Sequence, residues 1–475
     1  GSEMRASLLL LLASCSAFRT PVVRNHATLH RRCIAPLRAV AVQPEDKLPA
    51  ELLPVTLSVF AQMIGEGIAI ASLPLHLTKL GAKPVEVGLA TSAFSLAQMV
   101  CCPILVRSSG RVGRGRVLRW CLAGATLSNV GIACSPSVSA IVLFRGMGGA
   151  FAASAPVAQA AAADIVSPRQ TPAALSRVAA ASQMAIVVGP MCSAVLMEGF
   201  GRLGVPGELR LRAVFAATAV FACGVLGLLA TFDDGAALAA ATARDRAAGK
   251  TKTVGEFAGA GDFPAQPLLR AVALVVGWSL TLSVFGYGLF APKFLGYDQS
   301  RLSATFSAGA LTTIGAQLLF PRIVRRVGAH ATSCLGLLCL AAGMAGQTVA
   351  RNQPFHSALY LLNRAGSGVA DTSTATLVAR SSRDKDDRAR NLGLIQSTRA
   401  AARIFTPLVS GSLFAASCGF ATCPGSLPFL CNAGCALLAA PLPFLLLRAE
   451  RKAAARDADA FAVKKREDSA PPGTQ

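Results

Sequence analysis

The chain has 475 residues, of which 53% are hydrophobic and only 15% are charged, and this leaves too few polar side chains to cover a soluble globule of its size. The composition therefore excludes an ordinary soluble domain and favours a membrane protein. The net charge of +22 does not indicate nucleic-acid binding, because Lys and Arg are scattered in short clusters between apolar stretches instead of gathering with aromatic residues.

The 14 cysteines form no CxxC pair, and most of them lie inside apolar stretches. Cysteines in such surroundings are interpreted as small hydrophobic side chains rather than as disulfides or metal ligands. We expect neither a metal ion nor a cofactor.

The N-terminal segment has the composition of a targeting sequence. Residues 1–17 contain a run of leucines after one arginine and end in the small-residue site SCSA, which is typical of a signal peptide. Residues 18–50 begin with an arginine-rich stretch that is free of Asp and Glu as far as residue 43, which is typical of a transit peptide. The segment SAFRTP resembles the cleavage motif of plastid proteins in algae with secondary plastids, which implies a plastid envelope or another plastid-surrounding membrane. An ordinary secretory signal with a basic tail is the alternative.

Twelve apolar stretches of about 20 residues follow, each long enough to cross about 30 Å of hydrocarbon as a helix. Lys and Arg are concentrated in the even-numbered loops and the C-terminal tail, so both termini are expected on the cytosol-like or stroma-like side. The sequence thus predicts an all-α, multi-pass membrane protein. The expected spans are 52–77, 84–106, 117–135, 138–163, 173–197, 212–232, 268–292, 302–320, 331–350, 356–379, 391–416 and 425–447.

A polar, Ala/Gly-rich segment at residues 233–266 is expected to be a linker between two halves. It separates a predicted N-terminal six-helix bundle, residues 51–232, from a C-terminal one, residues 267–448, and residues 449–475 are expected to form a disordered polar tail. The linker contains Gly-Lys-Thr but lacks the earlier glycine of a P-loop, so no nucleotide site is predicted.

The two halves repeat the same features at nearly the same spacing. Arg145 and Gly149 of the fourth span recur as Arg364 and Gly368 of the tenth. The Gly-Pro of the fifth span recurs as Thr-Pro in the eleventh. Repetition of unrelated features at one offset favours an internal duplication.

The motifs around these residues resemble the major facilitator superfamily and, within it, the twelve-span drug:proton antiporter branch. Residues 70–118 resemble its first two spans with the basic loop that follows, and residues 143–190 resemble its fourth and fifth spans. The resemblance implies twelve transmembrane helices in two pseudo-symmetric six-helix bundles. Spans 1, 4, 7 and 10 would line a central cavity. It also implies secondary transport of a small organic solute, by proton-coupled antiport.

Two motifs depart from that family pattern. The loop after span 2 has Gly110 where the family has a carboxylate, although Gly113 and Arg114 are kept. The antiporter motif of span 5 keeps only small residues ahead of its Gly-Pro. We therefore do not expect this chain to make every contact that these two motifs make in the family.

Three charged residues inside spans are candidates for proton coupling. A charge at mid-membrane depth requires a wet cavity or a buried partner, and Glu66 of span 1 is a plausible partner for Arg145 of span 4. Glu66 either exchanges a proton or is only locked to that arginine. Asp371 of span 10 is either a second protonation site or a counter-ion for span 11.

The candidate substrate cavity contains more arginines than carboxylates. Arg399 and Arg403 lie one helical turn apart on span 11, and with the arginines of spans 4 and 10 they outnumber the two carboxylates. Such a surplus favours an anionic substrate, whereas the alternative is that both residues are tied to Asp371 and to backbone carbonyls. The proposed cavity residues are Gln62, Gln159, Tyr287, Asn363, Arg364, Gln396, Arg399 and Arg403.

Gating is expected at a basic loop and at two helix bends. Gly113 and Arg114 of the loop either anchor the chain by their charge or latch a gate. Gly189, Pro190 and Pro407 are expected to weaken helical hydrogen bonding and to act as hinges.

Together these patterns predict a secondary transporter that works by alternating access and is coupled to protons through Glu66. An organic-anion facilitator or exchanger that uses the cavity arginines is the alternative. The expected partners are a small organic solute, protons and the lipid bilayer, without nucleic acid, and the protein is expected to be a monomer. An embedded enzyme is disfavoured because the sequence contains no HExxH, GxSxG or complete P-loop motif. A sensor or scaffold on the same fold is the third alternative.

Overall fold

The computed structural model describes residues 48–82, 84–167, 169–230, 235, 265–297, 299–350, 352–421 and 423–452, and all regular structure in these ranges is helical. The targeting segment up to residue 47, nearly all of the expected linker and the tail from residue 453 lie outside them. The helices are α3 (Leu52–Lys79), α4 (Pro84–Val112), α5 (Arg114–Cys134), α6 (Val138–Ala150), α7 (Ser154–Ile165), α8 (Thr171–Arg202), α9 (Gly207–Ala230), α11 (Ala265–Leu295), α12 (Gln299–Val327), α13 (Ala329–Val349), α14 (Gln353–Ser381), α15 (Lys385–Ser417) and α16 (Leu427–Ala439).

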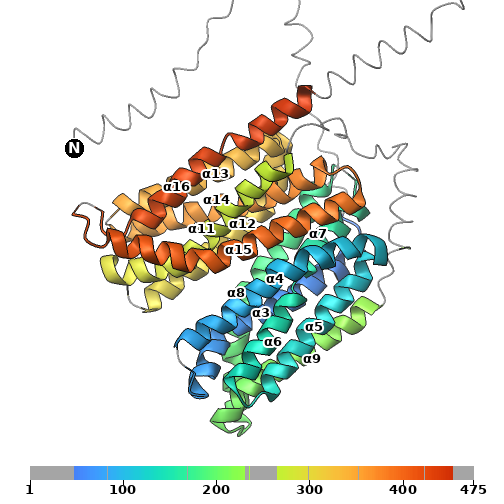
Figure 1. Ribbon diagram of the computed structural model, residues 1–475, viewed down its shortest axis with the longest axis vertical. Coiled ribbons are helices and arrows are strands. Elements are labelled where there is room, and N and C mark those ends of the chain that lie inside the picture. Colours follow the sequence, from blue (N-terminus) through green and yellow to red (C-terminus); the bar gives the residue numbers. More distant parts are fainter. Residues whose placement is uncertain are drawn as a thin grey trace, which may run out of the picture. The chain divides into compact units, whose positions relative to one another are not determined.

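Each of the twelve predicted spans corresponds to helix in the structure, with α6 and α7 together forming the fourth. Ten candidate spans in the described residues are long and apolar enough to cross a membrane, and the last of them continues from α16 to residue 452. Helices α14 and α15 are not among them, because they carry more polar and charged residues than the other spans. Helices α3–α9 form one six-span bundle and α11–α16 the other (Figure 1).

Small residues allow α3 and α8 to cross closely. A Cβ atom added to Gly67 would lie 2.8 Å from the carbonyl oxygen of Ile186, and one added to Gly189 would lie 2.7 Å from the Gly67 backbone. In a membrane, helices associate through such close packing because lipid offers no hydrophobic drive for it. Gly189, which the sequence suggested as part of a hinge, therefore also forms a helix crossing.

This crossing predicts that Gly67→Ala lowers stability even though alanine is the better helix former. The methyl group would have to displace backbone atoms, and overpacking of this kind costs about 1–3 kcal/mol. Thermal unfolding of the detergent-solubilised protein, followed by size-exclusion chromatography, measures the effect. Gly224→Ala on α9 is the matched control, since nothing lies within 4 Å of its added Cβ. An unchanged melting temperature for Gly67→Ala would contradict the crossing.

The internal repeat extends to the packing of each bundle. A Cβ on Gly149 of α6 would meet the carbonyl oxygen of Phe94 on α4, and a Cβ on Gly368 of α14 would meet that of Thr313 on α12. Phe94 precedes Gly149 by the same number of residues as Thr313 precedes Gly368. The same helix crossing is thus present in both halves.

Matching hydrogen bonds also join the two bundles. Ser176 Oγ of α8 donates to the carbonyl oxygen of Gln317 on α12 over 2.6 Å. In the other half, Ser397 Oγ of α15 donates to the carbonyl oxygen of Met99 on α4. The bundles therefore meet along two pseudo-symmetric helix pairs.

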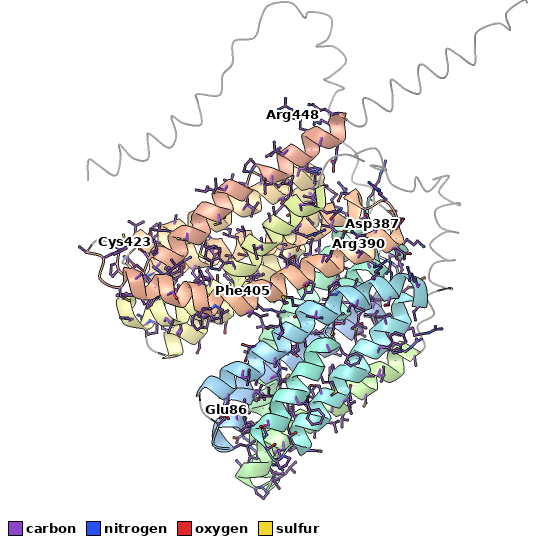
Figure 2. All side chains as sticks on the ribbon, in the orientation of Figure 1. Glu86, Asp387, Arg390, Phe405, Cys423 and Arg448 are labelled. Atoms are coloured by element: carbon purple, nitrogen blue, oxygen red, sulfur yellow. The ribbon has the colours of Figure 1, made fainter. Side chains whose placement is uncertain are left out.

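Close contact between α4 and α15 involves one half of each helix. A Cβ on Gly393 would lie 3.0 Å from Val106 and 3.1 Å from Pro103. Towards the middle of the helices, Ser397 bonds to Met99 and Arg403 to Gln98. Figure 2 shows Asp387 and Arg390 near one end of α15, and Glu86, near the start of α4, well away from them.

Candidate functional site

The fourth span is interrupted inside its bundle. Helix α6 ends at Ala150 and α7 begins at Ser154. Pro156 has no N–H group, so it cannot donate to the carbonyl oxygen of Ala152 one turn earlier. A discontinuous helix within a membrane leaves backbone groups that other parts of the protein must satisfy.

Two glutamines from neighbouring helices satisfy this interrupted backbone. Gln62 Nε2 of α3 donates to the carbonyl oxygen of Phe151 over 2.9 Å, and Gln62 Oε1 accepts from the Ser154 N–H over 3.2 Å. Gln98 Nε2 of α4 donates to the Ala152 carbonyl oxygen over 2.8 Å. Gln62, one of the predicted cavity residues, thus bonds to both sides of the break.

Glu66 and Arg145 form an ion pair, as their place in apolar spans suggested. Arg145 Nη1 and Nη2 donate to Glu66 Oε1 and Oε2, each over 3.2 Å. The guanidinium also lies 4.4 Å from the centre of the Phe94 ring. The Arg145 side chain is 7% exposed and that of Glu66 is 20% exposed, so the carboxylate is the more accessible partner.

Asp371 and Arg399 form a second ion pair between α14 and α15. Arg399 Nη2 lies 2.5 Å from Asp371 Oδ1, and each side chain is 14% exposed. Asp371 thus contacts an arginine of the next span, and its role in proton transfer stays a prediction.

Arg403 is exposed although it lies between the bundles. Its Nη2 donates to Gln98 Oε1 of α4, and it lies within electrostatic range of Glu66, Arg145 and Arg399. Arg403 is thus an exposed arginine whose side chain bonds across from one bundle to the other.

Arg364 is buried on α14, with 7% of its surface exposed. Within the described residues its guanidinium has no hydrogen bond and no ion pair, and its Nε atom is buried without a partner. Each of the two carboxylates is thus paired with one arginine, whereas Arg364 and Arg403 are paired with neither.

Tyr287 and Asn363 lie in a packed polar network between α11 and α14. Asn363 Oδ1 accepts from Ser279 Oγ over 3.0 Å, and its Nδ2 donates to Ser283 Oγ over 2.8 Å. The Tyr287 hydroxyl lies 3.2 Å from His356 Nδ1. Tyr287 and Asn363 are completely buried, so in this conformation they hold the two helices together.

The remaining two cavity candidates stand apart from these contacts. Gln159 is buried on α7, and Gln396 is half-buried on α15. The structure does not connect either side chain to the two ion pairs.

Charged residues close one end of the contact between the bundles. Arg114, which follows Gly113 at the start of α5, donates through Nε to Asp164 Oδ2 over 3.1 Å and through Nη2 to the carbonyl oxygen of Lys385 over 3.0 Å. Arg388 Nη1 of α15 donates to Asp164 Oδ1 over 2.9 Å. We call Arg114, Asp164 and Arg388 the latch. It joins the two bundles on the side that carries the basic loops.

Backbone geometry explains why glycine precedes the latch arginine. Gly113 has a φ of 108°, a conformation that residues other than glycine rarely adopt. Gly110, where the resembling family has a carboxylate, faces Asp386 of the other bundle so closely that an added Cβ would collide with its carboxylate. A carboxylate from α15 therefore lies beside the position where the α4 carboxylate is missing.

The predicted hinge prolines lie inside unbroken helices. Pro190 is within α8 and Pro407 within α15. Both positions stay candidates for bending during transport, since the structure presents one conformation.

Sequence reasoning missed the roles of Phe94 and Arg388. Phe94 could have been found from the internal repeat, because it stands at the position that corresponds to Thr313 in the second half. Arg388 carries no comparable signal, since many arginines lie in the basic loops.

Comparison with known proteins identifies the family of the chain. A family model described as Major Facilitator Superfamily matches residues 55–352, which is more than half of the sequence. The human Major facilitator superfamily domain-containing protein 10 is 32% identical over 109 residues. That match covers 23% of this chain and 24% of the human protein, so the chain matches about a quarter of the length of this relative.

Solved structures share the fold over most of the chain. The crystal structure of the human organic anion transporter MFSD10 (TETRAN) has a TM-score of 0.64 at 20% identity and covers 83% of this chain and 100% of the other. The E. coli fucose:proton symporter FucP has a TM-score of 0.65 at 9% identity, covering 83% and 98%. The proton:xylose symporter XylE has a TM-score of 0.63 at 14% identity, covering 82% and 94%. The chain belongs to the Major Facilitator Superfamily and is a transporter of small solutes rather than an enzyme.

Proposed function

We propose that the protein moves a small organic anion across its membrane, with the central site open alternately to the two sides. The observation that carries this proposal is the charge pairing between the bundles. Glu66 neutralises Arg145 and Asp371 neutralises Arg399, while Arg403 is exposed and bonded to a neutral amide. Guanidinium groups bind carboxylates in a two-pronged geometry, so an exposed one suits an organic acid.

The comparisons support the same substrate class. The human relative with the similar fold is described as an organic anion transporter. At 20% identity this likeness concerns the fold, so the substrate is argued from Arg403 and its surroundings.

The latch supports alternating access. It ties the bundles together on the side of the basic loops, where Asp164 holds one arginine from each bundle. Opening the latch would be the step that gives the central site access to the side of the basic loops.

Proton coupling is the second part of the proposal, and the accessible Glu66 favours it. Protonation of Glu66 would leave Arg145 without a counter-ion, which strengthens anion binding nearby. Two ligands that favour each other's binding travel together, because coupling is reciprocal. The charges thus favour symport of a proton with an anion. The antiport expected from the drug:proton branch would require that a bound proton weaken substrate binding.

Substitution of Arg403 tests the substrate class. In proteoliposomes, Arg403→Ala should reduce uptake of radiolabelled benzoate by about ten- to a hundredfold, the value of one hydrogen bond to a charged group. Arg403→Lys should retain part of the activity. Arg326→Ala, which removes an exposed arginine at the end of α12, is the control for net charge. Equal benzoate uptake by wild type and Arg403→Ala would contradict anion recognition at this residue.

We also propose a plastid envelope or another plastid-surrounding membrane as the location. The support is the arginine-rich, acid-free composition that follows the leucine run near the start of the sequence. A fusion of residues 1–50 to a fluorescent protein, expressed in an alga with secondary plastids, tests it by microscopy. Secretion of the reporter would favour the ordinary signal peptide.

A further inference from the structure

Arg364 is a buried cation whose partner is missing. Its Nε atom has no hydrogen bond within the described residues. Its side chain passes over Gly309 of α12, where an added Cβ would lie 3.1 Å from Arg364 Cγ. A charged group at this depth is retained in membrane proteins where it serves a pathway or a ligand.

Comparison with Arg145 shows how the two halves differ. Arg145 follows its carboxylate, Glu66, by 79 residues. The residue at the same distance before Arg364 is Phe285, on α11. The arginine is therefore present in both halves, whereas the carboxylate is present only in the first.

The neighbouring groups do not replace that carboxylate. Tyr360, one turn before Arg364, is the group that interacts with it electrostatically, and its hydroxyl donates to the carbonyl oxygen of Ser283 over 3.2 Å. Asp371 is two turns away on α14 and is paired with Arg399 over 2.5 Å. The charge on Arg364 is thus balanced by no group in the part of the chain that the structure describes.

Arg364 and Arg403 lie at similar depths. Helices α14 and α15 are consecutive spans that run in opposite directions, and the Asp371–Arg399 pair sets their register. Arg403 follows Arg399 by four residues, which is about 6 Å along α15. Arg364 precedes Asp371 by seven residues, which is about 10.5 Å along α14. Both displacements point away from the connecting loop, so the two arginines differ in depth by about 4–5 Å.

We propose that Arg364 is a second anion-binding subsite and that the substrate is a small organic dianion, with one carboxylate at Arg403 and the other at Arg364. This inference rests on the proposed function, since it requires Arg403 to bind an anion. No carboxylate in the described residues hydrogen-bonds to either arginine, and Glu66, which acts on Arg403 electrostatically, is bonded to Arg145. A dianion would supply one carboxylate to each arginine.

Matched aromatic acids test the second subsite. Benzoate carries one carboxylate, whereas isophthalate and terephthalate carry two at different separations on the same ring. Wild-type protein in proteoliposomes should take up at least one dicarboxylate about ten- to a hundredfold better than benzoate. Arg364→Gln should bring uptake of that dicarboxylate down to the level of benzoate, and Arg364→Lys should restore part of the preference.

A stability measurement separates ligand binding from a structural role. Without ligand, Arg364→Gln should melt at the wild-type temperature or above it, because it removes an unpaired buried charge. Stabilisation by the preferred dicarboxylate should be lost in this variant. Arg399→Gln is the matched control and should melt lower, since it leaves Asp371 unpaired.

The outcomes distinguish the two proposals. If wild type shows no preference for dicarboxylates, or if Arg364→Gln keeps the preference, the second subsite is wrong while benzoate uptake through Arg403 stands. A lower melting temperature for ligand-free Arg364→Gln would also overturn it, in favour of a structural role. If uptake of neither class depends on Arg403, the proposed function itself fails.

Discussion

Replacing Asp164 by asparagine is expected to destabilise the closed latch by about 3–5 kcal/mol, the cost of breaking a buried ion pair by removing one partner. Asp164 is 10% exposed and binds Arg114 of its own bundle and Arg388 of the other. Asparagine keeps the size of the side chain but not its charge. Two guanidinium groups would then face each other without a counter-ion.

Hydrogen–deuterium exchange of the whole protein measures this loss. Exchange should become faster in residues 105–118 and 382–395, the segments on either side of the latch, and remain unchanged in α13. At about 1.4 kcal/mol for each factor of ten, the expected loss corresponds to a factor of more than about a hundred in the population of the closed state. Transport should slow, because the conformation that is closed on the side of the basic loops becomes less stable and each transport cycle must pass through it.

An exposed ion pair provides the control for this substitution. Glu198→Gln removes the partner of Arg202, and both side chains are at least 70% exposed. Pairs of this kind contribute about 0–1 kcal/mol, so exchange near the latch should not change. If Asp164→Asn behaved like this control, the latch would have no role in holding the bundles together.

The amino-acid sequence was sufficient to predict the helices and the two bundles. Span length depends on runs of apolar residues, and the repeat of Arg145 and Gly149 as Arg364 and Gly368 is visible without coordinates. Features set by local composition or by duplication can therefore be obtained from one sequence.

The break in the fourth span was not predicted, although part of its cause is local. Pro156 removes the donor that would have bonded to the Ala152 carbonyl oxygen. A proline within a span more often bends the helix than interrupts it, and the difference here comes from Gln62 and Gln98 on other helices. Contacts between distant helices decide the outcome, and spacing along the chain does not reveal them.

The pairing of charges was likewise left open by the sequence. Arg399 and Arg403 are one turn apart on the same helix, and either could have been the partner of Asp371. The structure pairs Arg399 with Asp371 and directs Arg403 to Gln98 of the other bundle. One helical turn thus separates a neutralised arginine from an exposed one.

Replacing Glu66 by glutamine is expected to abolish accumulation driven by a pH gradient while leaving exchange of substrate for substrate intact. Glutamine keeps the shape of the side chain but cannot bind and release a proton. Arg145 would remain permanently without a counter-ion, as it would be in the protonated wild-type protein. In proteoliposomes loaded with unlabelled substrate, the variant should take up labelled substrate by exchange, and the rate of this uptake should be the same with and without the pH gradient.

Asp371→Asn is the matched control, because Asp371 is also a carboxylate paired with an arginine between helices. If the proton is carried at Glu66, this variant should keep its response to the gradient even if it is less stable. Loss of the response in Asp371→Asn alone would move the proton site to α14, and loss in neither would exclude coupling through these two carboxylates.

The direction of the gradient that drives uptake then separates symport from antiport. Protonation of Glu66 removes the negative charge that acts on both Arg145 and Arg403, so anion and proton should bind together. Uptake should therefore be fastest when the outside is more acidic than the lumen. Faster uptake with an acidic lumen would instead indicate antiport. Antiport requires that protonation of Glu66 weaken substrate binding, whereas an anion beside Arg145 and Arg403 should bind more tightly when Glu66 is protonated.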